Sequence, residues 1–112
     1  MDTQSLFSLA GRTALVTGGS RGIGKMIATG FIAQGAKVYI SSRKADVCKA
    51  VAEELGPNCI AVPQDISTVD GCKALAATMA EHEPGVDILV NNAGAAWGAV
   101  SYTHLRAHET SR

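Results

Sequence analysis

The sequence predicts an α/β fold in which a doubly wound parallel sheet, truncated after about four strands, carries helices on both faces. Two observations lead to this prediction. Short apolar runs of strand length alternate with longer stretches whose apolar residues recur at helical spacing, and glycine or proline separates them. A glycine-rich turn joins the first apolar run to the first helical stretch. This alternation is typical of β-α-β units, whose strands lie parallel in one sheet.

The first strand and helix form the most regular pair. Residues 12–17 (RTALVT) are a nearly continuous apolar run, as expected for a strand buried on both faces of a sheet. The helix that follows the glycine turn is expected to end at Gly35. The residues at helical spacing within it are Ile23, Ile27, Gly30, Phe31 and Gln34.

The second unit begins with residues 37–41 (KVYIS), which we expect to be a strand. A helix should follow and stop at Gly56, which precedes a proline. Its stripe consists of Val47, Val51 and Leu55.

The third unit begins with residues 59–63 (CIAVP). Ser67, with Asp70 three residues later, is expected to cap the next helix. Residues 86–90 (VDILV) are the fourth predicted strand. The stripe of the intervening helix consists of Cys72, Leu75, Ala76 and Met79.

Composition limits the possible partners. The 112 residues are at most one domain, and ten basic and ten acidic residues balance without a basic stripe, so we expect no nucleic acid and no anionic membrane as partner. No apolar run approaches the ~20 residues that span a bilayer, and the amino terminus lacks the basic region of a secretion signal. The cysteines Cys48, Cys59 and Cys72 match no metal-ligand spacing and suit a reducing compartment. We therefore expect a cytoplasmic protein without a metal.

The segment TGGSRGIGKM (17–26) fits two phosphate-binding patterns. From Gly19 it nearly matches the nucleoside triphosphate loop G-x-x-x-x-G-K, whose next residue must be Ser or Thr to hold Mg²⁺. That residue is Met26 here, which cannot ligate a hard cation. A triphosphate-binding domain is therefore disfavoured, and Lys25 is expected to be a solvated residue on the first helical turn.

From Thr17 the same segment matches T-G-x-x-x-G-x-G, a loop for the pyrophosphate of a dinucleotide. Gly18 would allow the tight turn, Gly22 the close approach of phosphate, and Gly24 the packing of helix against strand. The loop lies between a strand and a helix, where backbone N–H groups and the positive end of the helix dipole attract an anion. The sequence therefore predicts a dinucleotide site.

The end of the second strand indicates which dinucleotide. An acid there would bind the 2′-hydroxyl of NAD, whereas an arginine accommodates the 2′-phosphate of NADP. Ser42, Arg43 and Lys44 follow this strand, no acid occurs before Asp46, and Arg21 in the glycine loop offers another cation. We therefore expect NADPH as the cofactor.

At TGGSRGIG (17–24) and NNAG (91–94), each directly after its predicted strand, the sequence resembles the short-chain dehydrogenase/reductase family. The resemblance covers residues 7–98 and implies an NAD(P)-binding Rossmann domain. Within the family the sequence is most similar to bacterial NADPH-dependent 3-oxoacyl-[acyl-carrier-protein] reductases, including those of rhamnolipid synthesis. It thus implies a homo-oligomeric oxidoreductase whose substrate is a small-molecule ketone or a 3-oxoacyl thioester.

The resemblance also assigns cofactor contacts. It implies that Thr17 ties the first strand to the glycine loop and that Ser42 and Arg43 hold the 2′-phosphate. Asp65 and Ile66, just past the third strand, would contact the adenine. The other implied residues are Gly18, Ser20, Arg21, Gly22, Ile23 and Gly24 on the pyrophosphate and adenosine side, and Asn91, Asn92, Ala93 and Gly94 at the nicotinamide ribose.

The family's catalytic groups are not expected in this chain. Members of the family reduce a carbonyl with an Asn, a Ser and a Tyr-x-x-x-Lys pair, all beyond the NNAG segment. Tyr39 and Tyr102 each have an arginine four residues later, but Tyr39 lies inside a strand and Tyr102 follows the fourth strand too soon. A non-catalytic dinucleotide-binding module is the alternative to an enzyme fragment.

After residue 99 the apolar periodicity stops, and residues 100–112 resemble translated sequencing-adapter read-through. We therefore expect residues 1–99 to be the amino-terminal part of an NAD(P)-binding domain and 100–112 to be a tail outside the family. On this interpretation the i, i+4 spacing of His104 and His108 forms no metal site. The sheet is then expected to end in a bare apolar edge beside 86–90.

Overall fold

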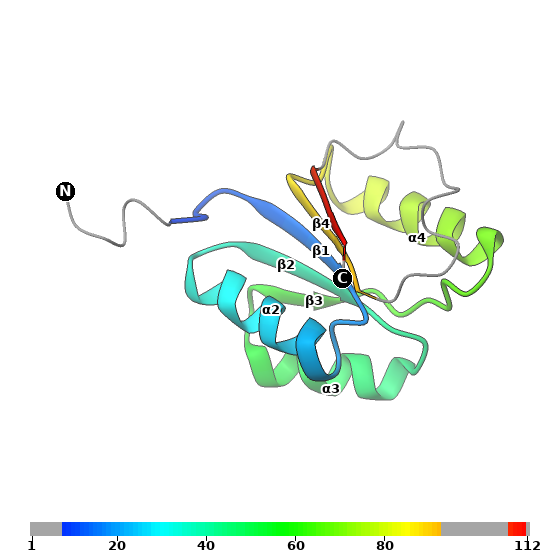
Figure 1. Cartoon of the computed structure of the whole chain (residues 1–112), viewed down its shortest axis with the longest axis horizontal. Helices are drawn as coiled ribbons and strands as arrows, with labels where there is room; N and C mark the ends of the chain where they lie inside the picture. The colour runs from blue at the N-terminus through cyan, green and yellow to red at the C-terminus, as the bar shows by residue number, and fades with distance from the viewer. Residues whose placement is uncertain (1–7, 93–107, 112) are drawn as a thin grey trace.

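The computed structural model describes residues 8–92 and 108–111. Parallel strands form one sheet in the order β3-β2-β1-β4-β5, with α2 and α3 on one face and α4 on the other (Figure 1). The strands are β1 (Thr13–Thr17), β2 (Lys37–Ser41), β3 (Cys59–Ala61), β4 (Ile88–Asn91) and β5 (His108–Ser111). The helices are α2 (Gly22–Ala33), α3 (Ala45–Leu55) and α4 (Val69–His82). This arrangement confirms the predicted doubly wound α/β fold.

The register of the sheet aligns the carboxyl ends of its central strands. Thr17 of β1 pairs with Ser41 of β2 on one side and with Asn91 of β4 on the other. Each of these residues is the last of its strand, so the segments that leave the three strands begin side by side at one edge. In a doubly wound sheet this is the edge where ligands bind.

The first four strands lie on the predicted apolar runs, with boundaries that differ by at most two residues. β3 ends at Ala61, because Pro63 has no N–H to donate to a ladder. β4 begins at Ile88 rather than at residue 86. Before it, Asp87 binds Thr13 with both main chain and side chain: its N–H donates to the Thr13 carbonyl and its carboxylate accepts the Thr13 N–H, each at 2.9 Å.

Two apolar clusters form the core, one on each face of the sheet. On one face Leu15, Tyr39 and Leu89 of the strands pack against α4. All four residues of the predicted α4 stripe are buried there, which confirms that stripe (Cys72, Leu75, Ala76, Met79). The other cluster joins strand residues to the inner sides of α2 and α3, and its buried members include Val16, Ile40, Val90, Ala28 and Val51. No helix within the described residues is both long and apolar enough to cross a bilayer.

The cysteines belong to these cores. Cys48, Cys59 and Cys72 are buried free thiols. Burial raises the pKa of Cys59 to about 11, so its thiol stays protonated and unreactive. All three pack in the apolar clusters, as small apolar side chains do.

The helices differ from the sequence prediction in the cap of α4 and in three residues of the α2 stripe, Ile23, Gly30 and Gln34, which are exposed. Ile23 is 52% exposed, because the first turn of α2 turns Gly24 and not Ile23 toward the sheet. The cap of α4 is Thr68, whose hydroxyl accepts the N–H of Gly71 at 3.0 Å. The predicted cap, Ser67, lies one residue outside the helix and donates its N–H to the Asp65 carboxylate at 2.9 Å.

The prediction of a bare edge beside β4 is wrong. β5 runs parallel to β4, in a register from Ile88↔His108 to Asn91↔Ser111. This pairing uses main-chain groups, which every residue except proline supplies in full. For that reason the side-chain pattern of the tail did not predict that β5 would form.

A polar cluster ties the beginning of β2 to the end of α4, at the sheet edge opposite the loops described above. The Tyr39 hydroxyl donates to the Glu83 carboxylate at 2.7 Å, and the Lys37 ammonium lies 2.8 Å from the same oxygen. The His82 ring packs against Tyr39 at 5.8 Å between centroids. The hydrogen bond to Lys37, followed by that to Tyr39, holds the pKa of Glu83 below its ordinary value.

Glu83→Gln should therefore lower the free energy of unfolding near neutral pH. We expect a loss of about 1–2 kcal/mol, around or below the lower end of the range for charged hydrogen bonds, because Lys37 is half-exposed. Since the pKa of Glu83 is lowered by folding, its contribution is complete above the unfolded pKa and disappears as pH falls through the folded one. Thermal unfolding from pH ~7 to ~3 should show the difference narrow in acid. A constant difference, or an equal loss in the exposed control Glu81→Gln, would contradict this.

Candidate cofactor-binding site

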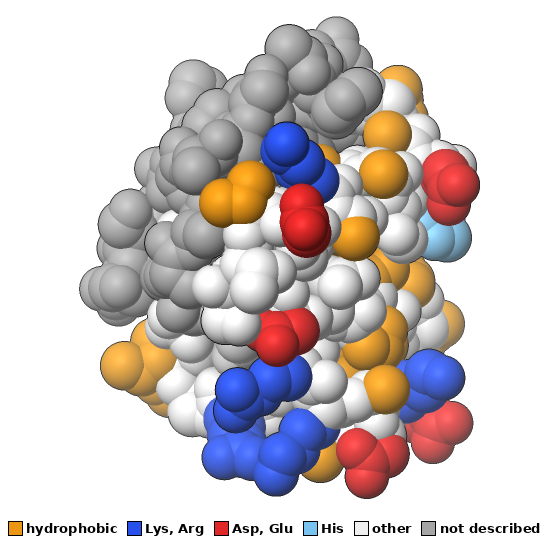
Figure 2. All heavy atoms as spheres, turned by 90° about the vertical axis from the view of Figure 1, so that its right-hand side faces the viewer, with side chains coloured by type: hydrophobic (Ala, Val, Ile, Leu, Met, Phe, Trp, Pro, Cys, Tyr) orange, Lys and Arg blue, Asp and Glu red, His pale blue; other side chains and the backbone are white. Residues whose placement is uncertain are grey.

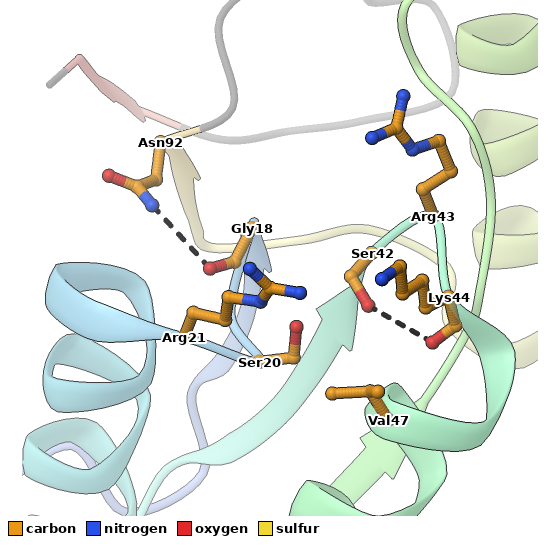
Figure 3. Close-up of a pocket in the computed structure, with 8 residues that line it drawn as sticks. All are labelled: Gly18, Ser20, Arg21, Ser42, Arg43, Lys44, Val47 and Asn92. Carbon is orange, nitrogen blue, oxygen red and sulfur yellow. Dashed lines mark hydrogen bonds between the residues drawn. The ribbon is translucent and has the colours of Figure 1, made fainter.

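Two adjoining cavities lie at the carboxyl edge of the sheet. The first, of about 400 Å³, opens between the glycine loop and the end of β2 (Figure 3). It is lined by Gly18, Ser20, Arg21, Ser42, Arg43, Lys44, Val47 and Asn92. The second, of about 290 Å³, shares Gly18, Ser42 and Arg43 with it and is otherwise lined by Ser41, Gln64, Asp65, Ile66 and Ser67.

The glycine loop is held close to the sheet. Gly18, with φ of 70°, donates its N–H to the carbonyl of Ser41 at 2.7 Å. A Cβ on Gly24 would overlap the Gly18 carbonyl oxygen and lie 2.8 Å from its carbon, so only glycine allows α2 to begin this close to β1. Gly22, with φ of 50°, has open space where a Cβ would lie. The loop thus leaves room for a ligand directly in front of α2.

The start of α2 is suited to an anion. Arg21 occupies the N-cap position with extended backbone, and its side chain makes no capping hydrogen bond. The first turn carries no acid, so the positive end of the helix dipole is not compensated there. Backbone N–H groups in such a position bind phosphate readily.

Cations surround the first cavity. In Figure 3 the side chains of Arg21 and Lys44 point into the space between the loop and the end of β2, whereas the Arg43 guanidinium extends away from Ser42. Figure 2 shows a group of lysine and arginine side chains near the lower end of the face that it draws, with acidic side chains beside them. Arg43 also lines the second cavity, where it faces Asp65. The cavity can therefore attract a ligand with several negative charges.

Asp65 and Ile66 line the second cavity. The hydrogen bonds from Ser67, and then the positive charge of Arg43, lower the pKa of Asp65, which keeps this exposed carboxylate ionised. Ile66 is only 7% exposed and belongs to the core on the α4 face. It therefore forms part of the cavity wall without projecting into the space.

The asparagines after β4 connect it to β1. The Thr17 hydroxyl lies 3.2 Å from the Val90 carbonyl and 3.3 Å from Asn91 Oδ1, so this side chain joins β1 to β4. Asn92 donates from Nδ2 to the Gly18 carbonyl at 3.5 Å (Figure 3). The remaining predicted residues of this segment, Ala93 and Gly94, lie outside the described residues, as do Tyr102 and His104.

Lys25 differs from its predicted role. Its ammonium bridges to Glu54 of α3 at 2.9 Å, so it connects two helices and is not simply solvated. Met26, the residue that argues against a triphosphate loop, is 68% exposed on the surface of α2. Neither residue lines either cavity.

The structure adds lining residues that the sequence analysis did not assign to a site. They are Ser41, Val47, Gln64 and Ser67. Each lies within a few residues of a strand end or helix start, but this position alone did not separate them from structural residues. Residues next to them in the sequence, such as Ser42 and Asp65, were identified from the resemblance to the family.

Comparison with known proteins identifies the family of the chain independently of this geometry. The short chain dehydrogenase family model matches residues 12–111. The rhamnolipids biosynthesis 3-oxoacyl-[acyl-carrier-protein] reductase of Pseudomonas aeruginosa is 53% identical over 95 residues, which cover 83% of this chain and 37% of that protein. Nodulation protein G of Rhizobium sp. is 45% identical over 89 residues, 80% of this chain and 36% of that one.

Two solved structures are also similar to this chain. The complex of Pseudomonas aeruginosa RhlG with NADP has a TM-score of 0.77 and 48% identity, over 89% of this chain and 42% of that one. The 3-ketoacyl-(acyl-carrier-protein) reductase of Brucella melitensis, complexed with NADH, has a TM-score of 0.72 and 41% identity, over 78% and 36%. The chain thus spans little more than a third of the two sequence relatives. The matched region contains the glycine loop and the strand ends that line both cavities, and the chain belongs to the short-chain dehydrogenase family.

Proposed function

We propose that this chain is the amino-terminal, cofactor-binding part of an NADPH-dependent short-chain oxidoreductase that reduces a ketone. The observation that carries the proposal is the set of three cationic side chains, Arg21, Arg43 and Lys44, around the cavity at the end of β2. Ser42 stands where an acid would favour NAD. Of the described residues that line either cavity, Asp65 is the one carboxylate, and it is bound by Ser67.

The residues present fit such a cofactor. The open space at Gly22 and the uncapped start of α2 suit a pyrophosphate, which needs close approach and a positive field. The first cavity, with its cations, suits the 2′-phosphate, and the second, with the apolar wall of Ile66, suits the adenine. Comparison alone does not separate NADP from NAD, since one of the similar structures contains NADP and another NADH. The choice of NADPH therefore rests on the cations.

The proposed role of the chain's own residues is to bind and orient the cofactor. When bound, the cofactor supplies the hydride for the reduction. Arg21 and the N–H groups at the start of α2 neutralise phosphate charge, while Asn92 keeps the loop fixed through Gly18. Asn91 and the segment after it would place the nicotinamide ribose at the centre of the sheet. The substrate end of the site, with its proton donor, is assigned to the longer protein of which this chain is proposed to be a part.

The proposed substrate is a 3-oxoacyl thioester. Its support is that the printed names of two similar proteins are 3-oxoacyl- and 3-ketoacyl-carrier-protein reductases. A homo-oligomeric, cytoplasmic parent is part of the same proposal, supported by the family and by the three buried free cysteines. In this proposal residues 1–99 are the amino-terminal part of the cofactor-binding domain, and residues 100–112 are a tail that adds β5 to its sheet.

Arg43→Glu should abolish or reverse a preference for NADPH over NADH. A charge-assisted contact to the 2′-phosphate contributes about 1.5–3 kcal/mol, which corresponds to about ten- to a hundredfold in affinity. Titration calorimetry with both cofactors measures the ratio. Lys49→Glu is the matched control, because it makes the same change of charge at an exposed position of α3 that lines neither cavity. Equal affinity of the unchanged protein for both cofactors would refute the NADPH assignment.

Gly24→Ala should abolish dinucleotide binding and lower the melting temperature. The new Cβ would overlap main-chain atoms of Gly18, which cannot move without displacing the loop. Gly30→Ala is the control in the same helix: nothing lies within 4 Å of its Cβ position, so alanine should stabilise the protein by about 0.5–1 kcal/mol. Thermal unfolding and NADP⁺ titration of both variants test this. Normal cofactor binding by Gly24→Ala would show that the close contact is not needed.

The 112-residue chain alone should reduce no ketone measurably. Neither tyrosine is followed by a lysine four residues later, so the general acid of the family is missing, which typically costs 10²–10⁴-fold in rate. NADPH absorbance with an acetoacetyl thioester measures turnover. A longer protein that continues into the native downstream sequence should be active. Its inactivity, with cofactor binding intact, would favour the non-catalytic dinucleotide-binding module.

A further inference from the structure

One hydroxyl at the proposed site lacks a hydrogen-bond partner. Ser41, the last residue of β2, is 1% exposed, and its Oγ is a buried side-chain oxygen with no partner among the described residues. Its main-chain carbonyl does have one, the N–H of Gly18 at 2.7 Å. Unpaired buried hydroxyls are rare in native proteins, and each one needs an explanation.

The position of Ser41 relates this hydroxyl to the second cavity. Side chains alternate along a strand, so Ser41 lies on the same face of the sheet as Tyr39, which packs in the cluster against α4. The second cavity lies on that face, between the end of β2 and the segment that leads into α4, and Ser41 is one of its lining residues. Asp65 and Ile66 line the cavity together with it.

We infer that Ser41 is a specificity-determining residue for the adenosine end of the dinucleotide, an inference that rests on the proposed function. Its oxygen is closed to solvent in the free protein, so the hydroxyl gains a partner when the serine side chain rotates toward that end of the cofactor in the second cavity. A hydroxyl rotates to donate or to accept, and adenosine offers acceptors in its ring nitrogens and both kinds of group in its ribose hydroxyls. In the unliganded protein the same hydroxyl is buried without compensation. Ser41 therefore favours the bound state at the expense of the free one.

The test measures two quantities that should move in opposite directions. In Ser41→Ala the unpaired oxygen is gone, so the melting temperature of the unliganded protein should rise by about 4 °C. Affinity for 2′,5′-ADP, which carries the adenosine and the 2′-phosphate but no nicotinamide, should fall about five- to tenfold. Removal of a purely structural serine would lower the melting temperature of the unliganded protein. Removal of a surface serine would change neither the melting temperature nor the affinity for 2′,5′-ADP.

Two further variants complete the experiment. Ser41→Cys keeps the size of the side chain with a weaker hydrogen-bonding group, so it should weaken 2′,5′-ADP binding without leaving a void. Ser8→Ala, at an exposed serine that lines neither cavity, should change neither quantity. Unchanged affinity in both Ser41 variants, or a lower melting temperature of unliganded Ser41→Ala, would overturn the inference while leaving the proposed function intact. Failure of the unchanged protein to bind 2′,5′-ADP would instead refute the proposed function, and the inference with it.

Discussion

Helix α2 begins so close to the end of β1 that no side chain fits between them. The arrangement of the strand ends at the carboxyl edge of the sheet depends on this contact. Gly24 lies against the main chain of Gly18. Gly18 in turn donates to the Ser41 carbonyl at the end of β2 and accepts from Asn92 after β4. One residue thus links the ends of three strands. A displacement of the α2 start would shift all of them, because each hydrogen bond has a fixed length and direction.

The net charge of zero conceals an uneven distribution of charge over the molecule. At the amino edge of the sheet the carboxylates are matched: Glu83 lies beside Lys37, and Asp87 is 3.8 Å from Arg12. At the carboxyl edge, among the described residues that line the cavities, the cations outnumber the one carboxylate. The described lining of the two cavities therefore carries three positive side chains and one negative one. Composition averages over the whole chain and cannot show this, whereas the positions of basic residues after a strand can.

The sequence predicted those features that depend on local chemistry. The glycine loop followed from its spacing together with its place between a strand and a helix, and the buried stripe of α4 followed from periodicity, because both are encoded within a few neighbouring residues. The cap of α4 was misplaced by one residue, since Ser67 and Thr68 are adjacent and both are good caps. The Lys25–Glu54 bridge, the Tyr39–Glu83 hydrogen bond and the orphaned hydroxyl of Ser41 could not be predicted. Each depends on how segments far apart in the chain pack together.

The parallel sheet also has a consequence for the order in which the protein can assemble. β1 is the first described strand of the sheet to leave a ribosome, yet its neighbour β4 lies 74 residues further along the chain, as the pair Ala14 and Ile88 shows. A parallel pair cannot be closed by a tight hairpin, and contacts this distant in sequence form slowly. During synthesis the central strand must therefore wait with one edge unpaired, which exposes it to aggregation. The pairing of β1 with β2, which needs a much shorter connection, is the expected first step of folding.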